Sequence, residues 1–459
     1  MSDLSQLVKA YDVRGVVPDQ LNETVARALG TAFVEMLRES GDEAERIVLA
    51  HDMRETGPAL VAAFAAGANS AGATVVHTGL GSTDQLYYAS GVLGLPGAMF
   101  TASHNPAQYN GIKLCRAGAR PVGQDSGLII VRQRAEELLN DVASVAEVPS
   151  SIEHRDLLAD YARHLRGLVD LTGIRPLKVV VDAGNGMGGH TVPAVLGDQE
   201  LTALPLDIVP LYFELDGSFP NHEANPLDPA NLVDLQAAVR EHGADLGLAF
   251  DGDADRCFVV DENGDPVSPS AITALVAKRE LARFPGSTVI YNLITSHAVP
   301  EIIKENGGVP VRSRVGHSFI KAEMARTNAV FGGEHSAHYY FRDFWFADTG
   351  MLAALHVLAA LGGQDQPLSL FAADFERYAA SGEINSTVAD AAAKVAEVRA
   401  AFPDATFDEL DGMTVQLADG AWFNLRASNT EPLLRLNVEA AKPDRMAALR
   451  DEVLGIVRG

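Results

Sequence analysis

Three polar side chains at the end of an apolar run have the types expected of a nucleophile or a phosphate carrier. Ser103, His104 and Asn105 follow the run Gly97–Phe100, and Pro106 then prevents regular helix or strand pairing. A serine on such a turn is exposed and held by a rigid backbone, as a nucleophile or a phosphate carrier must be. The alternative is an ordinary turn in which the serine and the asparagine cap the next element.

A second group consists of three carboxylates at alternate positions. Asp251, Asp253 and Asp255 follow the strand-like run Leu246–Phe250. Crowded like charges cost free energy unless a cation neutralises them, so the pattern predicts a bound metal ion. Ligands that are all oxygen favour Mg²⁺, Mn²⁺ or Ca²⁺. The alternative is a solvated acidic turn without a metal.

A calcium-binding EF-hand is another interpretation of the same segment. Glu262 stands where the twelfth ligand of that loop would be, but Arg256 occupies the sixth position, which requires glycine. The residues Phe258–Val260 also favour a strand where an EF-hand has a helix. The pattern therefore favours a catalytic divalent cation.

Two later loops combine side chains suited to sugar and phosphate recognition. Gly332–Tyr339 places a carboxylate, a hydroxyl and an imidazole at alternate positions, which suits hydrogen bonds to sugar hydroxyls. Arg426–Pro432 holds one guanidinium, two hydroxyls and an amide, which form a compact anion clamp. Polar surface turns have similar compositions, so each loop has that alternative.

A glycine-rich segment matches the fingerprint of dinucleotide-binding proteins. Gly184–Gly189 fits G-x-G-x-x-G after a predicted strand. That strand ends in Asp182, however, and no second strand with an acidic end follows at the expected distance. We therefore interpret the glycines as a tight strand-to-helix turn, with a nicotinamide dehydrogenase as a rival hypothesis.

The composition excludes several classes of partner. A chain of 459 residues exceeds a single core and predicts three or four domains. Its apolar content of 47% and charged content of 21% are typical of a soluble globular protein. The formal net charge of −25 argues against nucleic acid or an anionic membrane surface as a partner. We expect a monomer or a weak dimer that binds a small molecule.

The same sequence predicts a cytoplasmic location. Its first residues lack the basic and apolar regions of a signal peptide. The apolar runs near Ala59 and Leu352 are shorter than the ~18–20 residues that a membrane span needs. Cys115 and Cys257 are too few for a disulfide framework.

A repeated theme of strand, helix and parallel strand must position these loops. Each of three units opens and closes with an apolar strand, and the paired strands are residues 47–50 with 74–76, 179–181 with 208–209, and 289–291 with 309–311. Such βαβ units predict three α/β domains. After Gly362 we expect helices near 369–377 and 389–401, strands at 413–415, 422–425 and 433–438, and a closing helix from Pro443, which together form a smaller α+β domain.

These elements predict four domains. The expected ranges are 1–150 with the serine loop, 151–250 ending at the acidic loop, 251–366 with the acidic and sugar loops, and 367–459 with the anion clamp. Linkers are expected near 148–151 and 364–367.

The four loops in this order resemble the α-D-phosphohexomutase superfamily, and the resemblance covers nearly the whole chain. Residues 101–106 are similar to its phosphoserine loop, 251–256 to its metal loop, 333–338 to its sugar loop and 426–432 to its phosphate loop. Further segments that match are residues 11–15, 110–113 and 316–318. The resemblance implies three similar mixed α/β domains and a C-terminal α+β domain around a central active-site cleft.

The resemblance also implies a mechanism. Phosphorylated Ser103 would donate its phosphoryl group to a hexose phosphate, giving glucose 1,6-bisphosphate or mannose 1,6-bisphosphate, which turns over and returns the other phosphate. Mg²⁺ would be held by a phosphoserine oxygen and the three aspartates. The implied catalytic residues are Ser103, Lys113 as general acid/base, Arg14 and His104. The implied substrate-binding residues are Tyr11, Asn105, Arg256, His317, Glu334, Ser336, His338, Arg426, Ser428, Asn429 and Thr430.

Within the superfamily, residues 333–344 look most like bacterial phosphomannomutases and dual phosphomannomutase/phosphoglucomutases. Glucose and mannose differ only at C2, so dual activity is expected. One departure is Ile294, which stands where some dual enzymes carry a phosphate-facing lysine. The alternatives are a phosphoglucosamine mutase and a non-catalytic sugar-phosphate binding protein of the same fold.

Overall fold

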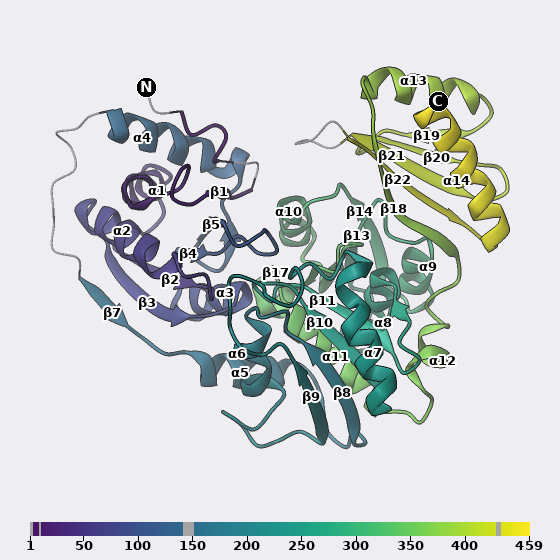
Figure 1. The fold of residues 1–459 in the computed structure, drawn as a ribbon, viewed down its shortest axis with the longest axis horizontal. Coiled ribbons are helices and arrows are strands. Elements are labelled where there is room, and N and C mark those ends of the chain that lie inside the picture. Colours follow the sequence, from purple (N-terminus) through teal and green to yellow (C-terminus); the bar gives the residue numbers. More distant parts are fainter. Residues whose placement is uncertain (1–2, 9–10, 141–150, 428–432) are drawn as a thin grey trace. The chain divides into compact units, whose positions relative to one another are not determined.

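The computed structural model describes residues 3–8, 11–140, 151–427 and 433–459. The chain divides into two units, Met1–Val267 with Ser336–Ser369, and Ser268–His335 with Leu370–Gly459. Figure 1 labels the elements of both units where there is room. Among the described helices, none has the length and the apolar character that a membrane span requires.

The first unit begins with a mixed sheet in the strand order β1-β5-β4-β2-β3-β7, and β6 pairs with β5. β2 is parallel to β3 and β4, whereas β5 is antiparallel to β1 and β4. The strands are β1 (Val13–Val16), β2 (Arg46–His51), β3 (Thr74–Leu80), β4 (Gly97–Phe100), β5 (Tyr109–Arg116), β6 (Arg120–Pro121) and β7 (Ile152–His154). The predicted strands at 47–50 and 74–76 are confirmed.

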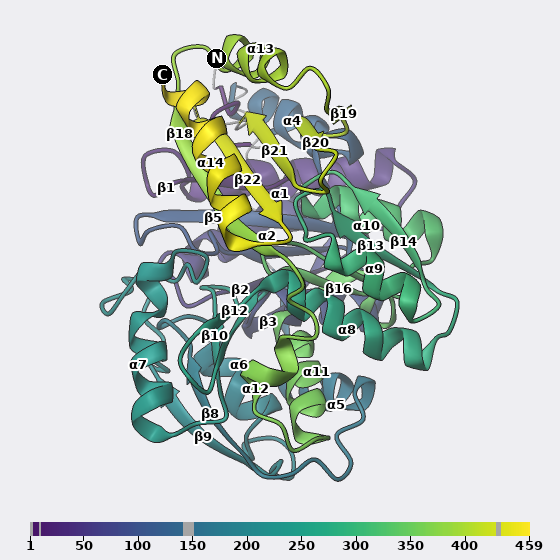
Figure 2. The ribbon, with the colours of Figure 1, turned by 90° about the vertical axis from the view of Figure 1, so that its right-hand side faces the viewer.

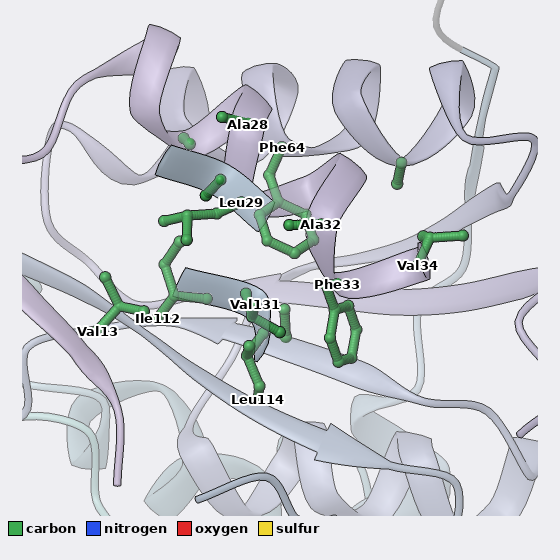
Figure 3. Packing of buried hydrophobic residues seen from close by; sticks show 14 of the residues in the cluster. Val13, Ala28, Leu29, Ala32, Phe33, Val34, Phe64, Ile112, Leu114 and Val131 are labelled. Carbon is green, nitrogen blue, oxygen red and sulfur yellow. The ribbon is translucent and has the colours of Figure 1, made fainter. Parts of the chain in front are cut away.

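Three helices cover one face of this sheet. They are α1 (Glu23–Glu39), α2 (Gly57–Ser70) and α4 (Leu128–Asn140), and they share one core with the strands (Figure 3). α1 begins at Asn22, whose side chain accepts a hydrogen bond from the Val25 amide. Phe64 packs edge to face on Phe100, with 5.4 Å between the ring centroids. Burying one such ring stabilises the fold by about 1.5–3 kcal/mol, so this core holds β4, and the turn after it, in place.

The second sheet of this unit has the order β12-β11-β10-β8-β9. β8 is parallel to β9 and β10, and β11 is antiparallel to β10 and β12. The strands are β8 (Leu177–Asp182), β9 (Leu206–Leu211), β10 (Leu246–Phe250), β11 (Cys257–Asp261) and β12 (Pro266–Val267). The other elements of the unit are α3 (Thr83–Leu93), α5 (Leu158–Leu168), α6 (Gly188–Val195), α7 (Val233–His242), the antiparallel pair β16 (Tyr339–Phe341) and β17 (Ala347–Asp348), α11 (Gly350–Gly362), and the 3₁₀ turns η1 (Gln124–Ser126), η2 (Pro229–Leu232) and η3 (Arg342–Phe344).

The acidic segment is the turn of the β10–β11 hairpin. Phe250 pairs with Cys257 directly across it. Strands on both sides show that the EF-hand interpretation is wrong. The expected domain boundary between residues 250 and 251 falls inside this hairpin, and the four domain ranges otherwise stay predictions.

The second unit contains a third α/β sheet. Its central strand β13 (Thr288–Asn292) is parallel to β14 (Val309–Ser313) and β15 (Phe331–Gly333). The predicted third strand–helix–strand unit is therefore confirmed. Its helices are α8 (Pro269–Arg283), α9 (Ala298–Glu305) and α10 (His317–Thr327).

The C-terminal sheet of this unit is antiparallel, in the order β18-β22-β21-β20-β19. α14 (Pro443–Arg458) lies across it, and α13 (Ala391–Ala401) joins the same core (Figure 2). The strands are β18 (Ala379–Thr387), β19 (Thr406–Asp408), β20 (Met413–Gln416), β21 (Trp422–Ala427) and β22 (Leu433–Ala440). The described elements agree with the expected α+β domain.

Two expectations near the start of this segment need correction. The helix predicted at 369–377 is only α12 (Leu368–Ala372), and β18 was not expected. Only Ser386 is buried along β18, so this strand lacks the apolar alternation by which strands are recognised. Residues 364–367 lie between α11 and α12, as predicted for a linker, whereas 148–150 fall outside the described residues.

Candidate active site

The serine turn is held in an unusual backbone conformation. β4 is fully buried, and Ser103 follows it with a φ of 51°, in the left-handed region that favours glycine. The Ser103 amide donates to Thr101 Oγ1 at 2.8 Å, and the Asn105 amide donates to the Ala102 carbonyl at 3.0 Å. Strained residues of this kind cluster at functional sites. The Ser103 side chain is thereby aimed in one direction, although it is only 5% exposed.

The Ser103 side chain points toward the acidic turn. Ser103 Oγ donates to Asp251 Oδ2 at 3.0 Å, across 148 residues of sequence. Asp251, Asp253 and Asp255 are buried, and one carboxylate oxygen of each lies within 4.8 Å of the other two. Ser103 and the three aspartates therefore form one cluster.

A close approach of the two backbones allows this contact. A Cβ on Gly252 would lie 2.4 Å from the Ser103 carbonyl oxygen, so a larger residue would push the turns apart. The Met187 amide of the glycine-rich segment donates to the Gly252 carbonyl at 2.9 Å from the other side. In this structure the Gly184–Gly189 segment packs against the acidic turn.

Two cations neutralise part of the acidic charge. Lys113 Nζ donates to Asp253 at 2.6 Å and to Asp255 at 2.7 Å, and Arg256 Nε donates to Asp251 at 2.8 Å. Burial lowers the pKa of Lys113, but the two carboxylates outweigh that effect and hold the pKa well above its usual value. Lys113 is therefore charged at neutral pH.

Asp251 and Asp253 titrate differently because their surroundings differ. Burial raises the pKa of Asp251 to about 7, against the opposing charge of Arg256. Burial also acts to raise the pKa of Asp253, but Lys113 outweighs it and holds the pKa below its usual value. The buried oxygens Oδ1 of Asp253 and Asp255 make no hydrogen bond with the described residues. Buried carboxylate oxygens without a hydrogen bond suit a hard divalent cation.

Other predicted residues of this unit surround the serine. His104 Nδ1 lies 3.2 Å from Ser103 Oγ and accepts from Arg256 Nη2 at 2.8 Å. Burial and the charge of Arg256 hold the pKa of His104 well below its usual value, so the ring is neutral. Arg14, on β1, donates to Asn105 Oδ1 at 2.5 Å. Tyr11 lies two residues before β1.

His338 joins the acidic turn through a second carboxylate. His338 Nδ1 lies 3.0 Å from Asp348 Oδ2 and 3.9 Å from Asp255 Oδ1, and these three residues form another group with metal-ligand spacing. Its backbone bridges to Arg256. Ser336, two residues earlier, is partly exposed.

The remaining predicted residues lie in the second unit. Glu334 is buried and accepts from Asn292 Nδ2 and from the Gly316 amide, each at 3.2 Å. His317 follows that glycine as the first residue of α10. Arg426, near the end of β21, lies 3.6 Å from Glu383. Ser428, Asn429 and Thr430 fall outside the described residues.

Sequence reasoning missed residues that organise the site. Thr83 Oγ1 donates to Asp253 Oδ2 at 2.5 Å, and its amide donates to the Asp253 carbonyl at 3.0 Å. Asp52 and Arg54, just after β2, contact each other and the serine loop. The signal available in the sequence was a polar segment at the end of an apolar strand.

Four family models match successive parts of the chain. They are phosphoglucomutase/phosphomannomutase alpha/beta/alpha domains I, II and III at residues 5–140, 159–264 and 268–378, and the C-terminal domain at residues 383–456. The chain belongs to the phosphoglucomutase/phosphomannomutase family. This membership confirms the resemblance and the predicted fold class, and places the chain among isomerases of carbohydrate metabolism.

Relatives of the phosphoglucomutase/phosphomannomutase family match over their full length. The phosphohexose mutases of Xanthomonas campestris are 42% identical over 98% of this chain and 99% of theirs. A phosphomannomutase of Escherichia coli is 40% identical over 98% of each chain.

Two solved structures share the fold. A phosphoglucomutase/phosphomannomutase family protein of Burkholderia thailandensis has a TM-score of 0.87 and 32% identity over 100% of this chain and 98% of its own. The N-acetylphosphoglucosamine mutase of Aspergillus fumigatus, solved in complex with GlcNAc-6P and magnesium, has a TM-score of 0.62 and 14% identity over 100% of this chain and 97% of its own. The similarity to the Aspergillus fumigatus protein shows only that the two chains share a fold.

Proposed function

We propose that this chain interconverts hexose 1-phosphates and hexose 6-phosphates, acting on mannose phosphates and, because the sugars differ only at C2, on glucose phosphates as well. The observation that carries the proposal is the position of Ser103 Oγ, 3.0 Å from Asp251 in a buried acidic triad. The relatives named phosphomannomutase support the choice of sugar.

The donor set of the acidic turn fits Mg²⁺. Its ligand atoms are all carboxylate oxygens, and two of them are buried without a hydrogen bond to any described residue. Asp251, Asp253 and Asp255 would hold the ion together with an oxygen of phosphorylated Ser103. When bound, Mg²⁺ supplies positive charge against the phosphoryl group that is transferred.

Ser103 is the proposed phosphoryl carrier. The P–Oγ bond of phosphoserine breaks as a P–O bond forms at the free hydroxyl of the hexose phosphate, which yields a hexose 1,6-bisphosphate. That hydroxyl gives up its proton, and Oγ gains one. The bisphosphate then reorients and returns its other phosphoryl group to Ser103.

Lys113 is the proposed general acid/base for these transfers. It is held protonated by Asp253 and Asp255, so it enters the reaction as the proton donor. Neutral His104 and the guanidinium groups of Arg14 and Arg256 would orient the phosphoryl group beside Ser103.

The other predicted residues are proposed to bind the substrate. Glu334 and Ser336 would accept hydrogen bonds from the 3- and 4-hydroxyls of the sugar, and Arg426 would hold the phosphate that is not transferred. The remaining proposed contacts come from Tyr11, Asn105, His317, His338, Ser428, Asn429 and Thr430. A cytoplasmic location and a monomeric or weakly dimeric state stay predictions from the sequence.

The test compares the wild type with Ser103→Ala in coupled assays on mannose 1-phosphate and glucose 1-phosphate. We expect the variant to lose at least about two to three orders of magnitude in rate, because the carrier is gone. Intact mass after incubation with glucose 1,6-bisphosphate should show one added phosphate on the wild type and none on the variant. Wild-type-like turnover by Ser103→Ala would refute the covalent mechanism.

Two outcomes would identify the alternatives. Turnover of glucosamine 6-phosphate with none of mannose 1-phosphate would indicate a phosphoglucosamine mutase. Binding of hexose phosphates without turnover or phosphorylation of Ser103 would indicate a sugar-phosphate binding protein.

A further inference from the structure

One buried arginine binds the backbone of the serine loop at four points. Arg54, three residues after β2, is 2% exposed. Its Nη2 donates to the carbonyls of Ser103 at 2.9 Å and Asn105 at 2.7 Å. Its Nη1 donates to the carbonyls of Pro106 at 3.0 Å and Tyr109 at 2.8 Å. These carbonyls span the whole loop that joins β4 to β5.

The guanidinium is itself held from two other sides. Asp52 is fully buried, with Oδ1 accepting from the Arg54 amide at 3.0 Å and Oδ2 lying 3.3 Å from Arg54 Nε. The ring of Phe219 lies 5.2 Å from the guanidinium carbon. Gly217, two residues before Phe219, packs so closely on the Arg54 backbone that a Cβ there would lie 2.9 Å from the Arg54 Cα. The Arg54 side chain therefore has one position.

The four carbonyl contacts exclude a role for Arg54 as a phosphate ligand. A guanidinium has four terminal N–H groups. In this structure the two terminal nitrogens together donate four hydrogen bonds to the loop. A charged group with this much desolvation is costly to bury unless its partners satisfy it. The hydrogen bonds of Arg54 stabilise the loop that carries Ser103.

That loop needs such support because its central residue is strained. Ser103 has a φ of 51°, and Gly252 of the acidic turn presses against the same carbonyl that Arg54 binds. Relaxation of this φ would rotate Oγ away from Asp251. A small misplacement of a reacting group is enough to slow a transfer strongly.

We propose that Arg54 is a positioning residue, which fixes the backbone of residues 103–109 so that Ser103 Oγ stays aimed at the acidic triad. The proposal rests on the proposed function of Ser103 as phosphoryl carrier. Arg54 acts through the loop and does not contact the transferred group. Its loss therefore lowers kcat far more than it weakens the binding of the hexose phosphate.

The test is Arg54→Lys, with Arg166→Lys as the matched control. A lysine keeps the charge but cannot reach four carbonyls from one nitrogen. Arg166 also donates to backbone carbonyls of another loop, those of Val195 at 2.6 Å, Gly197 at 2.8 Å and Thr202, but none of them belongs to the serine loop. Both variants remove the same kind of contact.

We expect Arg54→Lys to lower kcat about tenfold to a hundredfold with KM changed less than about threefold. Deuterium uptake by the amides of residues 101–111 should rise, because the turn opens more often. Arg166→Lys should leave both quantities at the wild-type level. A normal kcat in Arg54→Lys, or a raised KM with unchanged kcat, would overturn the proposal.

Two measurements keep the proposal separate from the proposed function. If the wild type shows no mutase turnover, the proposed function fails, while the deuterium uptake of residues 101–111 still decides whether Arg54 holds the loop. If Arg54→Lys does not fold, Phe219→Leu loosens the guanidinium without removing its carbonyl contacts. That variant should show the same changes to a smaller extent, and wild-type values for kcat and for uptake would count against the positioning role.

Discussion

At the scale of single residues, the acidic turn shows how one sequence pattern yields two different carboxyls. Asp251 faces Arg256 and has a pKa raised to about 7 by burial, whereas Asp253 faces Lys113 and keeps its charge. The ion pairs with Lys113 and Arg256 satisfy only some of the buried oxygens. The unsatisfied oxygens favour a metal site over a purely structural ion-pair cluster.

Asp253→Asn tests the metal site. The amide removes a negative charge and one hard oxygen ligand, so Mg²⁺ affinity should fall at least about tenfold, with mutase activity lost to the same extent at low Mg²⁺. Calorimetric titration of the chelator-treated protein with Mg²⁺ measures the affinity. EDTA should abolish activity, and added Mg²⁺ should restore it.

Asp261→Asn is the control for that variant. Asp261 lies at the far end of the same hairpin and accepts from the amides of Asn263 and Asp265, each at 2.9 Å. Its substitution should leave Mg²⁺ affinity unchanged. Equal losses in both variants, or full activity in chelator without detectable metal, would contradict the assignment.

At the scale of elements, three histidines lie on neighbouring parallel strands. His51 ends β2, His77 lies in β3 and His154 ends β7. The ring centroid of His77 lies 5.5 Å from the ring centroids of both His51 and His154. Burial and the two adjacent rings lower the pKa of His77 to about 4. A proton is therefore disfavoured at this point of the sheet.

His77 should make the fold sensitive to acid. In the unfolded chain its pKa is near the ordinary 6.5, so below that pH the unfolded state binds a proton that the folded state refuses. Stability is thus lost as the pH falls from about 6.5 towards about 4. His77→Gln should reduce the fall in Tm between about pH 7.5 and pH 5 by about 1–3 °C, the effect being small because the ring is partly exposed.

The exposed His242, at the end of α7, is the matched control. His242→Gln should leave the pH dependence of Tm as in the wild type, when both are followed by circular dichroism in buffers of equal ionic strength. An unchanged pH dependence in His77→Gln would show that His77 does not take up a proton on unfolding.

At the scale of the whole molecule, the predicted residues separate by unit. Those assigned to phosphoryl transfer lie in Met1–Val267, whereas Glu334 and Arg426 lie in the other unit. Chemistry and binding should therefore respond to different substitutions.

Arg426→Ala tests this separation. A charge-assisted contact between arginine and phosphate contributes about 1.5–3 kcal/mol, so kcat/KM should fall about tenfold to a hundredfold or more. Mg²⁺ affinity and the phosphate load on Ser103 after incubation with a hexose bisphosphate should persist, the latter reached more slowly. Steady-state kinetics, calorimetry and intact mass measure the three quantities.

Arg435 offers a control on the neighbouring strand. It is the register partner of Arg426 and lies 3.6 Å from the same Glu383. Arg435→Ala should disturb Glu383 in a similar way without the loss in kcat/KM. If both variants lose activity equally, the effect comes from Glu383; if neither does, Arg426–Pro432 is an ordinary polar turn.

The sequence by itself determined the local chemistry and most of the elements. Apolar runs such as Ile47–Ala50 and Val289–Tyr291 became strands because a buried parallel strand needs apolar residues on both faces. The order of the four loops was enough to indicate the family, since each loop is a contiguous set of side chains. β18 was missed because a strand with one buried residue has no such pattern.

Only the tertiary structure decided which distant residues meet. Lys113 contacts Asp253 across 140 residues of sequence, and Thr83 contacts it across 170. Arg54 reaches the serine loop from a different strand. The packing of two sheets sets these contacts, and no spacing along the chain encodes it. For the same reason the protonation of Lys113 and the strain at Ser103 follow from burial and backbone geometry, which exist only once the chain has folded.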